Sequence, residues 1–155
     1  GTDAIAERFV DGRELYVGVM GNEKLQVFPV WEINLSKMPD GAHRIATDRV
    51  KWNVDYQKKH KIITNEAKDL PDSLVEQIQR VSKRVYRALE MSGYARMDLR
   101  LDSEGKFFVM EANANPQLAF GEDFAESAER NGLSYEELLQ RILSYGLRWR
   151  PESPG

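Results

Sequence analysis

One segment of the sequence, residues 96–116, constrains the fold more than any other. Polar and apolar residues alternate on both sides of Asp102-Ser103-Glu104-Gly105, a run that is typical of a tight turn. Two alternating runs joined by a short turn predict an antiparallel β-hairpin. In that hairpin Leu101 is expected to pair with Lys106, and the pairing continues outward from there.

Side chains alternate between the two faces of a strand, so the hairpin has one apolar face. The residues expected on that face are Met97, Leu99, Leu101, Phe108, Met110 and Ala112. An apolar sheet face needs a cover of helices to bury it. The sequence therefore predicts an α+β fold in which helices pack against an antiparallel sheet.

The opposite face of the hairpin carries Arg96, Asp98, Glu111 and Asn113. Asp98 is expected diagonally across from Glu111, with roughly 7–8 Å between the two backbones, and Asn113 follows on the same face. Two carboxylates and an amide are oxygen donors of the kind that Mg²⁺ binds, usually together with phosphate and water oxygens. A magnesium site is one interpretation of this face. The other is an exposed ion pair between Arg96 and Glu111, worth under about 1 kcal/mol.

The first third of the chain has the pattern of β-strands. Runs of strand-forming residues at 5–10, 14–20 and 25–33 are separated by Asp11-Gly12 and by Gly21-Asn22. We expect three strands in an antiparallel meander. Gly18, in the middle of the second strand, marks a bulge or the close approach of another backbone, or is neutral.

Residues 34–69 have no sustained period and are expected to form a long mobile loop, a feature that is often functional. The loop is rich in basic side chains, namely Arg44, Arg49, Lys51, Lys58, Lys59, His60 and Lys61. Trp52 and Tyr56 lie among them, but the cluster is short and the net charge of the chain is −3, so we expect no nucleic-acid partner. His43 and His60 have no second ligand at metal spacing, and a zinc site is not expected.

A long amphipathic helix is predicted after this loop. Pro71 and Asp72 open it, and Gly93 ends it. Apolar residues recur between them at steps of three and four, which indicates a buried stripe. The stripe consists of Leu74, Ile78, Val81, Val85, Ala88 and Leu89.

Two further helical segments are expected near the end of the chain. Ser134 followed by Glu137 is a capping-box signature, and the helix that it starts should stop at Gly146. The residues expected to face inward from that helix are Leu138, Ile142 and Leu143. A short amphipathic segment that ends at Gly132 precedes it, with Phe124, Ala125 and Ala128 as its apolar residues.

Composition excludes several classes of protein. The chain has no cysteine, so disulfides and thiolate metal sites are excluded. No apolar run approaches the roughly 20 residues that cross a bilayer, and nothing resembles a signal peptide, so we expect a cytoplasmic protein without a membrane partner. The 155 residues are enough to bury a core, and we expect one domain over 1–147 and a tail over 148–155.

Several segments, taken in order, resemble one known family. Residues 93–98 (Gly-Tyr-Ala-Arg-Met-Asp), the tripeptide Glu111-Ala112-Asn113 and the pair Asn115-Pro116 resemble the metal-binding end of ATP-grasp enzymes, specifically of the D-alanine:D-alanine ligase-like branch. Residues 7–14 resemble the nucleotide-binding segment of that family, and residues 132–139 its closing helix. The resemblance covers nearly the whole chain. It implies the carboxy-terminal lobe of an ATP-grasp fold.

The resemblance also implies binding sites for ATP and Mg²⁺. In that family Asp98, Glu111 and Asn113 would hold Mg²⁺, which Mn²⁺ could replace, on the ATP phosphates. Arg96 would be catalytic and would stabilise the charge of an acyl phosphate and of the tetrahedral intermediate that follows. Lys59 lies in a stretch that resembles the mobile loop over the phosphates, where it would bind phosphate and act in catalysis. A solvated basic loop is the alternative for that stretch.

The same resemblance assigns the end of the site that binds the base and the sugar. Glu7 would accept from the adenine amino group, Val10 would cover the adenine face and make a backbone contact, and Glu14 would bind the ribose hydroxyls. A carboxylate accepts two vicinal hydroxyls well, and an aliphatic side chain covers a flat base. Without the resemblance, both glutamates would be interpreted as solvated strand residues.

The implied activity is that of an ATP-dependent carboxylate–amine ligase that acts through an acyl phosphate on small-molecule carboxylate and amine substrates. The matched region is only one lobe, so we expect a fragment of a larger enzyme that is inactive without the missing amino-terminal lobes. A homodimer is left open. The alternative is a non-catalytic nucleotide- or protein-binding module of the same fold, and a simple α+β interaction domain is a third interpretation.

The sequence departs from the dipeptide ligases directly after the metal-binding segment. Those enzymes continue with Gly, a stretch containing Thr or Ser, and Pro, which help to bind the carboxylate of the second substrate. Here Gln117 projects an amide where glycine would allow close approach, and Glu122 and Asp123 would repel a carboxylate. D-alanine is therefore disfavoured as the acceptor, and a different amine, for example a cationic one, is easier to accommodate.

Overall fold

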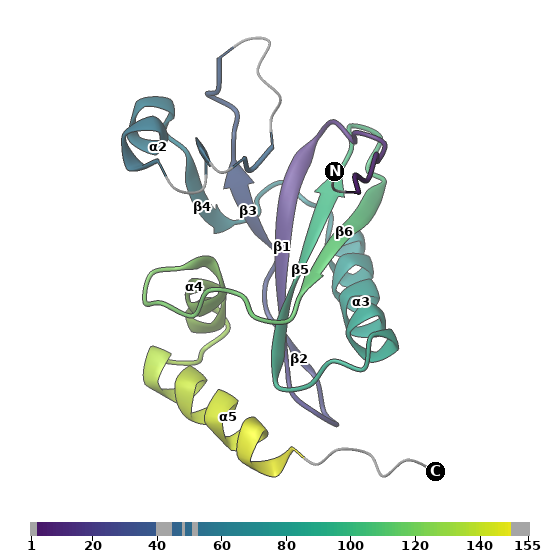
Figure 1. Ribbon diagram of the computed structural model, residues 1–155, viewed down its shortest axis with the longest axis vertical. Coiled ribbons are helices and arrows are strands. Elements are labelled where there is room, and N and C mark those ends of the chain that lie inside the picture. The colour runs from purple at the N-terminus through teal and green to yellow at the C-terminus, as the bar shows by residue number, and fades with distance from the viewer. Residues whose placement is uncertain (1–2, 40–44, 48, 51–52, 150–155) are drawn as a thin grey trace.

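The computed structural model of the 155-residue chain describes residues 3–39, 45–47, 49–50 and 53–149. Its centre is an antiparallel sheet with strand order β4-β3-β1-β5-β6, and a short strand, β2, pairs with β1 (Figure 1). The strands are β1 Arg13–Met20, β2 Gln26–Val27, β3 Trp31–Asn34, β4 Ile63–Glu66, β5 Tyr94–Leu101 and β6 Phe107–Asn113. The helices that lie wholly within the described residues are α2 Val54–His60, α3 Asp72–Ala88, α4 Asp123–Arg130 and α5 Tyr135–Arg148. The predicted α+β architecture is confirmed.

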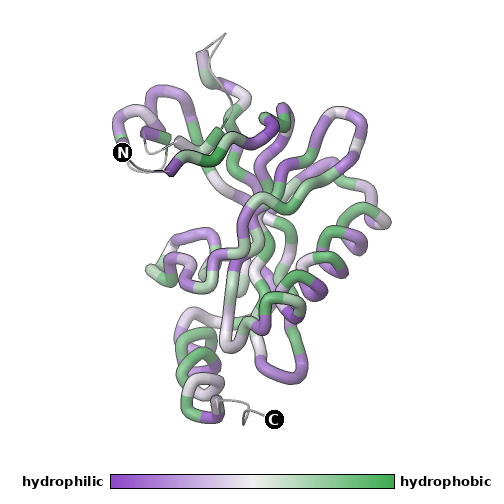
Figure 2. The backbone as a smooth tube through the Cα atoms, turned by 45° about the vertical axis from the view of Figure 1, so that its right-hand side comes forward, coloured by the Kyte–Doolittle hydropathy of each residue, from purple (hydrophilic) through white to green (hydrophobic). Residues whose placement is uncertain are grey.

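One face of the central strand β1 belongs to a core shared with α3. Leu15, Val17 and Val19 are fully buried there, together with Ile78 and Tyr86 of α3. Alternating hydrophobic and hydrophilic stretches are visible along this helix in Figure 2. Since every second residue of β1 points this way, the strand buries an unbroken apolar row on one side of the sheet.

The other face of β1 is covered at one end by α4 and α5. Met20 and Phe28 pack there with Phe124 of α4 and Leu138 of α5. Gly18 lies on the same face, and a Cβ at this position would be 2.5 Å from Phe28 Cδ2 and 3.1 Å from Phe124 Cε2. Gly18 therefore marks a close approach, made by two aromatic side chains rather than by backbone.

The hairpin of β5 and β6 forms, but its register differs from the predicted one. Leu101 pairs with Phe107 instead of Lys106. The reason is that the Asp102 carboxylate accepts hydrogen bonds from the backbone N–H groups of Glu104 (3.0 Å) and Lys106 (2.8 Å), which draws Lys106 into the turn. An irregularity between Asp98 and Leu99 then shifts the register again, and beyond it Asp98 pairs directly with Glu111.

The shifted register changes which residues of β6 reach the core. Phe107 and Ala112 pack against the core cluster, so the predicted place of Ala112 is confirmed. Phe108 and Met110 were expected beside it, and that prediction is wrong. Phe108 lies under the ammonium group of Lys106 at 5.0 Å, and Met110 is 45% exposed.

The strands expected in the first third of the chain are only partly present. Residues 5–10 have no regular secondary structure and are largely exposed, so the first predicted strand is wrong. The second expected strand corresponds to β1. The third is divided into β2 and β3, because Pro29 between them has no N–H to donate to a sheet ladder.

Residues 34–69 are not one irregular loop, because they contain α2 and β4. Helix α2 begins after Asn53, whose side chain accepts a hydrogen bond from the backbone N–H of Tyr56 at 2.8 Å, and β4 pairs with β3. Four residues named above in this segment lie outside the described residues: His43, Arg44, Lys51 and Trp52. The mobility of the segment stays a prediction.

The predicted stripe of α3 is present along most of its length. Ile78 is fully buried, and Leu74 and Val85 pack partly buried against the same cluster. Leu89 is 56% exposed, however, because the helix ends at Ala88 and Leu89 is its C-cap. The last turn of the stripe is therefore not part of the core.

Helices α4 and α5 follow the predicted signals closely at their beginnings. Phe124, Ala125 and Ala128 of α4 are buried, as expected. The capping box of Ser134 and Glu137 is present, with the Glu137 N–H donating to Ser134 Oγ at 3.2 Å and the Ser134 N–H to Glu137 Oε2 at 2.9 Å.

The end of α5 differs from the prediction. The helix runs through Gly146 to Arg148, because glycine inside a helix lowers its stability by only about 1 kcal/mol relative to alanine. Leu138 is fully buried, but Leu143 is 64% exposed, so its predicted inward position is wrong. Residues 150–155 of the expected tail lie outside the described part of the chain. Among the described residues, no helix combines the length and the apolar character needed to span a membrane.

Candidate functional site

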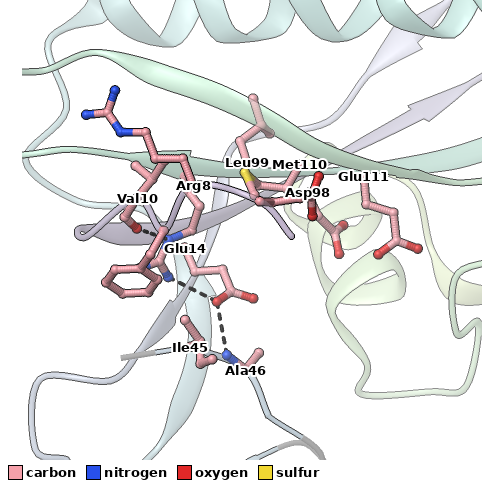
Figure 3. Close-up of a pocket in the computed structure, with 12 residues that line it drawn as sticks. Arg8, Val10, Glu14, Ile45, Ala46, Asp98, Leu99, Met110 and Glu111 are labelled. Carbon is pink, nitrogen blue, oxygen red and sulfur yellow. Dashed lines mark hydrogen bonds and ion pairs between the residues drawn. The ribbon is translucent and has the colours of Figure 1, made fainter. Parts of the chain in front are cut away.

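A cavity of about 340 Å³ lies beside the sheet. Strands β1, β5 and β6 contribute to its wall, together with the irregular segments 7–10 and 45–46 (Figure 3). The described residues that line it are Glu7, Arg8, Phe9, Val10, Glu14, Ile45, Ala46, Asp98, Leu99, Arg100, Met110 and Glu111. Its volume falls within the range of about 300–1,000 Å³ that is typical of small-molecule sites.

At one end of the cavity, the Glu14 carboxylate is a centre of hydrogen bonds. Its Oε1 atom accepts from the Tyr16 hydroxyl at 2.8 Å. Its Oε2 atom accepts from the Ala46 N–H at 3.1 Å and from Arg100 Nη1 at 3.2 Å. Burial and then the charge of Glu14 raise the pKa of Tyr16 far above its ordinary value, so this hydroxyl keeps its proton and donates. Since a carboxylate offers about four lone-pair positions, Glu14 has little acceptor capacity left.

Arg100 connects this carboxylate to the irregular segment 7–10. Its Nε atom donates to the Val10 carbonyl oxygen at 3.0 Å, and its guanidinium carbon lies 5.8 Å from the centre of the Phe9 ring. Arg100 is 5% exposed, and it is the direct partner of Glu14 across the ladder of β1 and β5. The segment that lines one side of the cavity is thereby tied to the sheet.

The other end of the cavity is acidic. Asp98 and Glu111 are direct cross-strand partners, so their side chains leave the same face of the sheet, as the alternation predicted. They are opposite each other rather than diagonal, because of the irregularity next to Asp98. Asp98 is 8% exposed, whereas Glu111 is exposed. Asn113 follows two residues later, and its Oδ1 atom accepts from the Asn115 N–H at 2.9 Å.

Arg96 binds Asp98 and not Glu111, so the predicted alternative of an Arg96–Glu111 ion pair is wrong. Its Nε and Nη2 atoms donate to the two Asp98 oxygens at 2.7 and 2.8 Å, and its guanidinium lies 4.4 Å from the centre of the Tyr16 ring. Burial alone would lower the pKa of Arg96, but the hydrogen bonds and charge of Asp98 outweigh it and raise that pKa. Arg96 is therefore a permanent cation beside the acidic end.

Asp123, in the first turn of α4, is a second carboxylate near Arg96, with its Oδ2 atom 3.7 Å from Arg96 Nη1. Burial raises the pKa of Asp123, and the opposing effects of a hydrogen bond with Thr64 and of the Arg96 charge are smaller. Helix α4 thus brings an acidic side chain to the face of the sheet that carries Arg96 and Asp98.

The acidic end has the oxygen donors for a hard cation but does not enclose one. Among the described residues, no group of three Asp, Glu, His or Cys side chains is placed to hold a metal ion. What the hairpin offers is two carboxylates and one amide, Asp98, Glu111 and Asn113, on one face. A partial ligand set of this kind suits Mg²⁺, which commonly takes its remaining ligands from phosphate oxygens and water.

The structure does not bring every predicted site residue to the cavity. Glu7, Val10, Glu14, Asp98 and Glu111 line it, although 84 positions or more separate the first three from the last two. The remaining candidates, Arg96, Asn113 and Lys59, are not among the described residues that line it. Arg96 and Asn113 are paired on the adjoining part of the hairpin, whereas Lys59 is exposed in the last turn of α2.

Two contributions to the cavity were missed from the sequence. Arg100 follows Arg96 and Asp98 at the same two-residue spacing, so strand alternation alone could have placed it on the charged face. Ile45 and Ala46 lie in a stretch without periodicity, and no local pattern indicates that the Ala46 N–H donates to Glu14.

Comparison with known proteins defines the family. Residues 2–144 match the family model described as the D-ala D-ala ligase C-terminus. The D-alanine–D-alanine ligase of Bordetella petrii is 32% identical over 148 residues, which cover 92% of this chain and 40% of that protein. An uncharacterized protein, y4sG, of Sinorhizobium fredii is 31% identical over 146 residues, covering 94% of this chain and 41% of its own length.

Solved structures agree with the family model. The D-alanine–D-alanine ligase of Bacillus anthracis complexed with ATP superposes with a TM-score of 0.68 at 25% identity, covering 92% of this chain and 40% of that one. The enzyme of Coxiella burnetii, at 23% identity, supports the fold with a TM-score of 0.71 and coverage of 91% and 33%. The chain is a carboxy-terminal lobe of the ATP-grasp type, and it belongs to the D-alanine–D-alanine ligase C-terminal family. It spans about 40% of the length of the curated relatives that it matches.

Proposed function

We propose that this chain is the ATP- and Mg²⁺-binding lobe of an ATP-dependent carboxylate–amine ligase that acts through an acyl phosphate. The observation that supports this most directly is the composition of the cavity. Glu7, Val10 and Glu14 line it together with Asp98 and Glu111, and these are the residues that the family resemblance assigns to nucleotide and metal. Segments far apart in the sequence thus meet at one cavity.

In this proposal one part of the cavity binds the base and ribose of ATP, and the other part binds the phosphates. Glu7 would accept from the adenine amino group, Val10 would cover the base, and Glu14 would bind a ribose hydroxyl. Because Glu14 already accepts three hydrogen bonds, it has room for about one more donor unless the Ala46 N–H moves away. The phosphates would then extend toward Asp98 and Glu111.

The acidic end fits the role of a magnesium site. Asp98, Glu111 and Asn113 would hold Mg²⁺, or Mn²⁺, together with phosphate oxygens. When bound, the metal would neutralise phosphate charge and polarise the transferred phosphoryl group. The bidentate contact between Arg96 and Asp98 keeps one acidic ligand oriented before nucleotide arrives.

The proposed reaction has two steps. A substrate carboxylate oxygen attacks the γ-phosphorus of ATP, the bond to ADP breaks, and an acyl phosphate forms. The amine of the second substrate then attacks the acyl carbon, loses a proton and displaces phosphate, leaving a C–N bond. Arg96 would stabilise the negative charge that develops on the acyl phosphate and on the tetrahedral intermediate, because a fixed cation counts most where charge appears. Lys59 would contact phosphate, which requires α2 to approach the cavity.

The second substrate differs from D-alanine in this proposal. Gln117 stands where the resemblance to the dipeptide ligases implies a glycine, Glu122 is the N-cap of α4 and Asp123 is the first residue of that helix. Asp123 lies beside Arg96, so a carboxylate arriving there would meet a like charge. An amine without a carboxylate at that position, or a cationic amine, suits these residues better.

The relatives are longer than this chain, so we place the activity in a parent protein with amino-terminal lobes. In the same proposal, the parent protein acts on small-molecule carboxylates and amines and is located in the cytoplasm. A homodimer is compatible with it. A non-catalytic module of the same fold is the competing function. It is favoured by the position of Lys59, which is exposed in α2 and not among the described residues at the cavity.

The deciding experiment is to screen the parent protein for ATP hydrolysis against pools of carboxylates and amines, and to identify the product by mass spectrometry. We expect Mg²⁺-dependent ADP release that needs both substrates, and a product whose mass equals acid plus amine minus water. Tight binding of Mg²⁺ and ATP without turnover in any pool would favour the non-catalytic module. Absence of ATP binding would contradict both the ligase function and a nucleotide-binding module.

A further inference from the structure

Arg100 is the buried cation of the cavity to which the proposed function assigns no task. It is 5% exposed and lines the cavity from β5, two residues beyond Asp98. Its side chain bonds to the Val10 carbonyl oxygen and to Glu14, two residues that are labelled in Figure 3. Because the proposed function assigns Arg100 no contact with metal or phosphate, another role has to account for this buried side chain.

Its guanidinium group contacts two different segments at once. Nη1 lies 3.2 Å from Glu14 Oε2 in the central strand, and Nε donates to the Val10 carbonyl oxygen at 3.0 Å. The side chains of the Arg100–Glu14 pair are only 6% and 14% exposed, so water screens this contact little. The planar fork of an arginine can hold a carboxylate and a carbonyl together, whereas a lysine ammonium has no such fixed geometry.

The segment that Arg100 holds needs such a contact. Residues 7–10 have no regular secondary structure, so no ladder of backbone hydrogen bonds fixes them to the sheet. They nevertheless line the cavity beside Glu14. The Arg100 contact to the Val10 backbone sets the distance between this segment and the strand that carries Glu14.

We propose that Arg100 is a positioning residue for the part of the cavity that binds the base and the ribose, acting through the Val10 backbone and the Glu14 carboxylate. This inference rests on the proposed function. It predicts different effects of Arg100 at the two ends of the cavity. Loss of Arg100 weakens recognition of the nucleoside and leaves recognition of the phosphates unchanged.

The first test needs no nucleotide. Arg100→Met keeps an unbranched side chain but removes both contacts, so the segment should detach from the sheet more often. Trypsin should then cut the bond between Arg8 and Phe9 about tenfold faster, as expected for one lost charge-assisted hydrogen bond when cleavage follows local opening. Arg130→Met is the control, because it removes the exposed ion pair with Glu66 away from the cavity. An unchanged rate at Arg8 in Arg100→Met overturns the positioning role.

The second test compares two ligands of the chain by isothermal titration with Mg²⁺ present. ATP carries base, ribose and phosphates, whereas inorganic tripolyphosphate carries the phosphates alone. We expect Arg100→Met to raise the dissociation constant for ATP about tenfold and that for tripolyphosphate less than about twofold. Arg100→Lys should recover part of the ATP affinity, and it also carries the test if Arg100→Met fails to fold.

The outcomes separate the inference from the proposed function. Equal losses for ATP and tripolyphosphate would mean a general loss of structure and would overturn the inference. Unchanged ATP affinity would overturn it as well, with the proposed function intact. If the wild-type chain and its parent bind neither ligand, the proposed function fails, and the nucleotide part of the inference fails with it, whatever the rate of cleavage at Arg8.

Discussion

The two ends of the cavity hold carboxylates in opposite situations. At one end Glu14 accepts hydrogen bonds from Tyr16, Ala46 and Arg100 and is largely enclosed. At the other end the Glu111 side chain is exposed, and in the described part of the chain no hydrogen bond or ion pair joins that carboxylate to another residue. The same chemical group is therefore largely occupied by protein donors at one end and open to solvent at the other.

Asp98 is intermediate between these two cases. It is nearly buried, like Glu14, and each of its two oxygens accepts one hydrogen bond from Arg96. A buried carboxylate without a partner would be costly, and Arg96 removes that cost before any metal arrives. Because a carboxylate offers about four lone-pair positions, a metal ion at Asp98 would share the carboxylate with Arg96, whereas at Glu111 it would meet an exposed carboxylate.

The largest expected effect tests the available end. Glu111→Gln keeps size and hydrogen bonding but removes a negative charge, so Mg²⁺-dependent ATP turnover of the parent should fall roughly a hundredfold or more. The free energy of unfolding should stay within about 0.5 kcal/mol of wild type, because the side chain is exposed. Steady-state kinetics measure the ATP turnover, and urea unfolding measures the free energy of unfolding. Glu104→Gln, in the exposed turn of the same hairpin, is the control, and full turnover in Glu111→Gln would remove Glu111 from the site.

The second prediction tests the structural end. Glu14→Gln removes the buried carboxylate charge that Arg100 contacts at 3.2 Å, so the free energy of unfolding should fall by about 1–3 kcal/mol. Urea unfolding of the chain measures this, with exposed Glu136→Gln as the control. A variant as stable as wild type would show that the network around Glu14 contributes nothing to the fold and that the contrast between the two ends is wrong.

A smaller loss is expected when a single donor to Glu14 is removed. Tyr16→Phe deletes the hydroxyl that donates to Glu14 Oε1 and should lower the free energy of unfolding by about 1 kcal/mol. Tyr94→Phe removes an exposed hydrogen bond to Asn115 and should change stability less. Equal effects of the two variants in urea unfolding would mean that enclosure of the carboxylate does not strengthen its bonds.

The smallest effect concerns pH and Asp123, the carboxylate of α4 near Arg96. Burial raises its pKa above the ordinary value of 3.8, so the folded chain binds this proton more tightly than the unfolded chain. Its contribution to stability is therefore present below pH 3.8 and is lost as pH rises through the raised value. Asp123→Asn removes this titration.

Urea unfolding of wild type and Asp123→Asn over a pH series measures this contribution. The free energy of unfolding of wild type, relative to that of the variant, should decline as the pH rises from 3.8 through the raised pKa of Asp123. A relative stability that increases with pH would mean that the ion pair with Arg96 outweighs burial.

Local signals predicted the elements that local interactions build. The capping box of Ser134 and Glu137 needs only residues of one helical turn, and it formed as expected. The hairpin needs only its turn, but its register depends on side-chain bonds of Asp102 that hydrophobic alternation does not encode. One residue of slip was enough to place Phe107 instead of Phe108 against the core cluster.

Some candidate site residues are also brought together by local sequence, and others only by the tertiary structure. Asp98 and Glu111 are neighbours across one hairpin, so spacing alone brought them together. Glu14 and Arg100 are 86 residues apart and meet only because β1 and β5 are neighbours in the sheet. Lys59 was expected on a mobile loop, and the folding of α2 around Asn53 carries it on a helix instead.

The sequence by itself determined an antiparallel hairpin with acidic residues on one face, amphipathic helices to cover the other, and the resemblance to a ligase lobe. These depend on the two-residue and 3.6-residue periods of strands and helices, which a chain carries in its order of residues. Only the tertiary structure decided which carboxylate is enclosed and which is open. That depends on strand order, on the unpatterned Ala46 reaching Glu14, and on Arg100 bonding to Val10, contacts that no local period can encode.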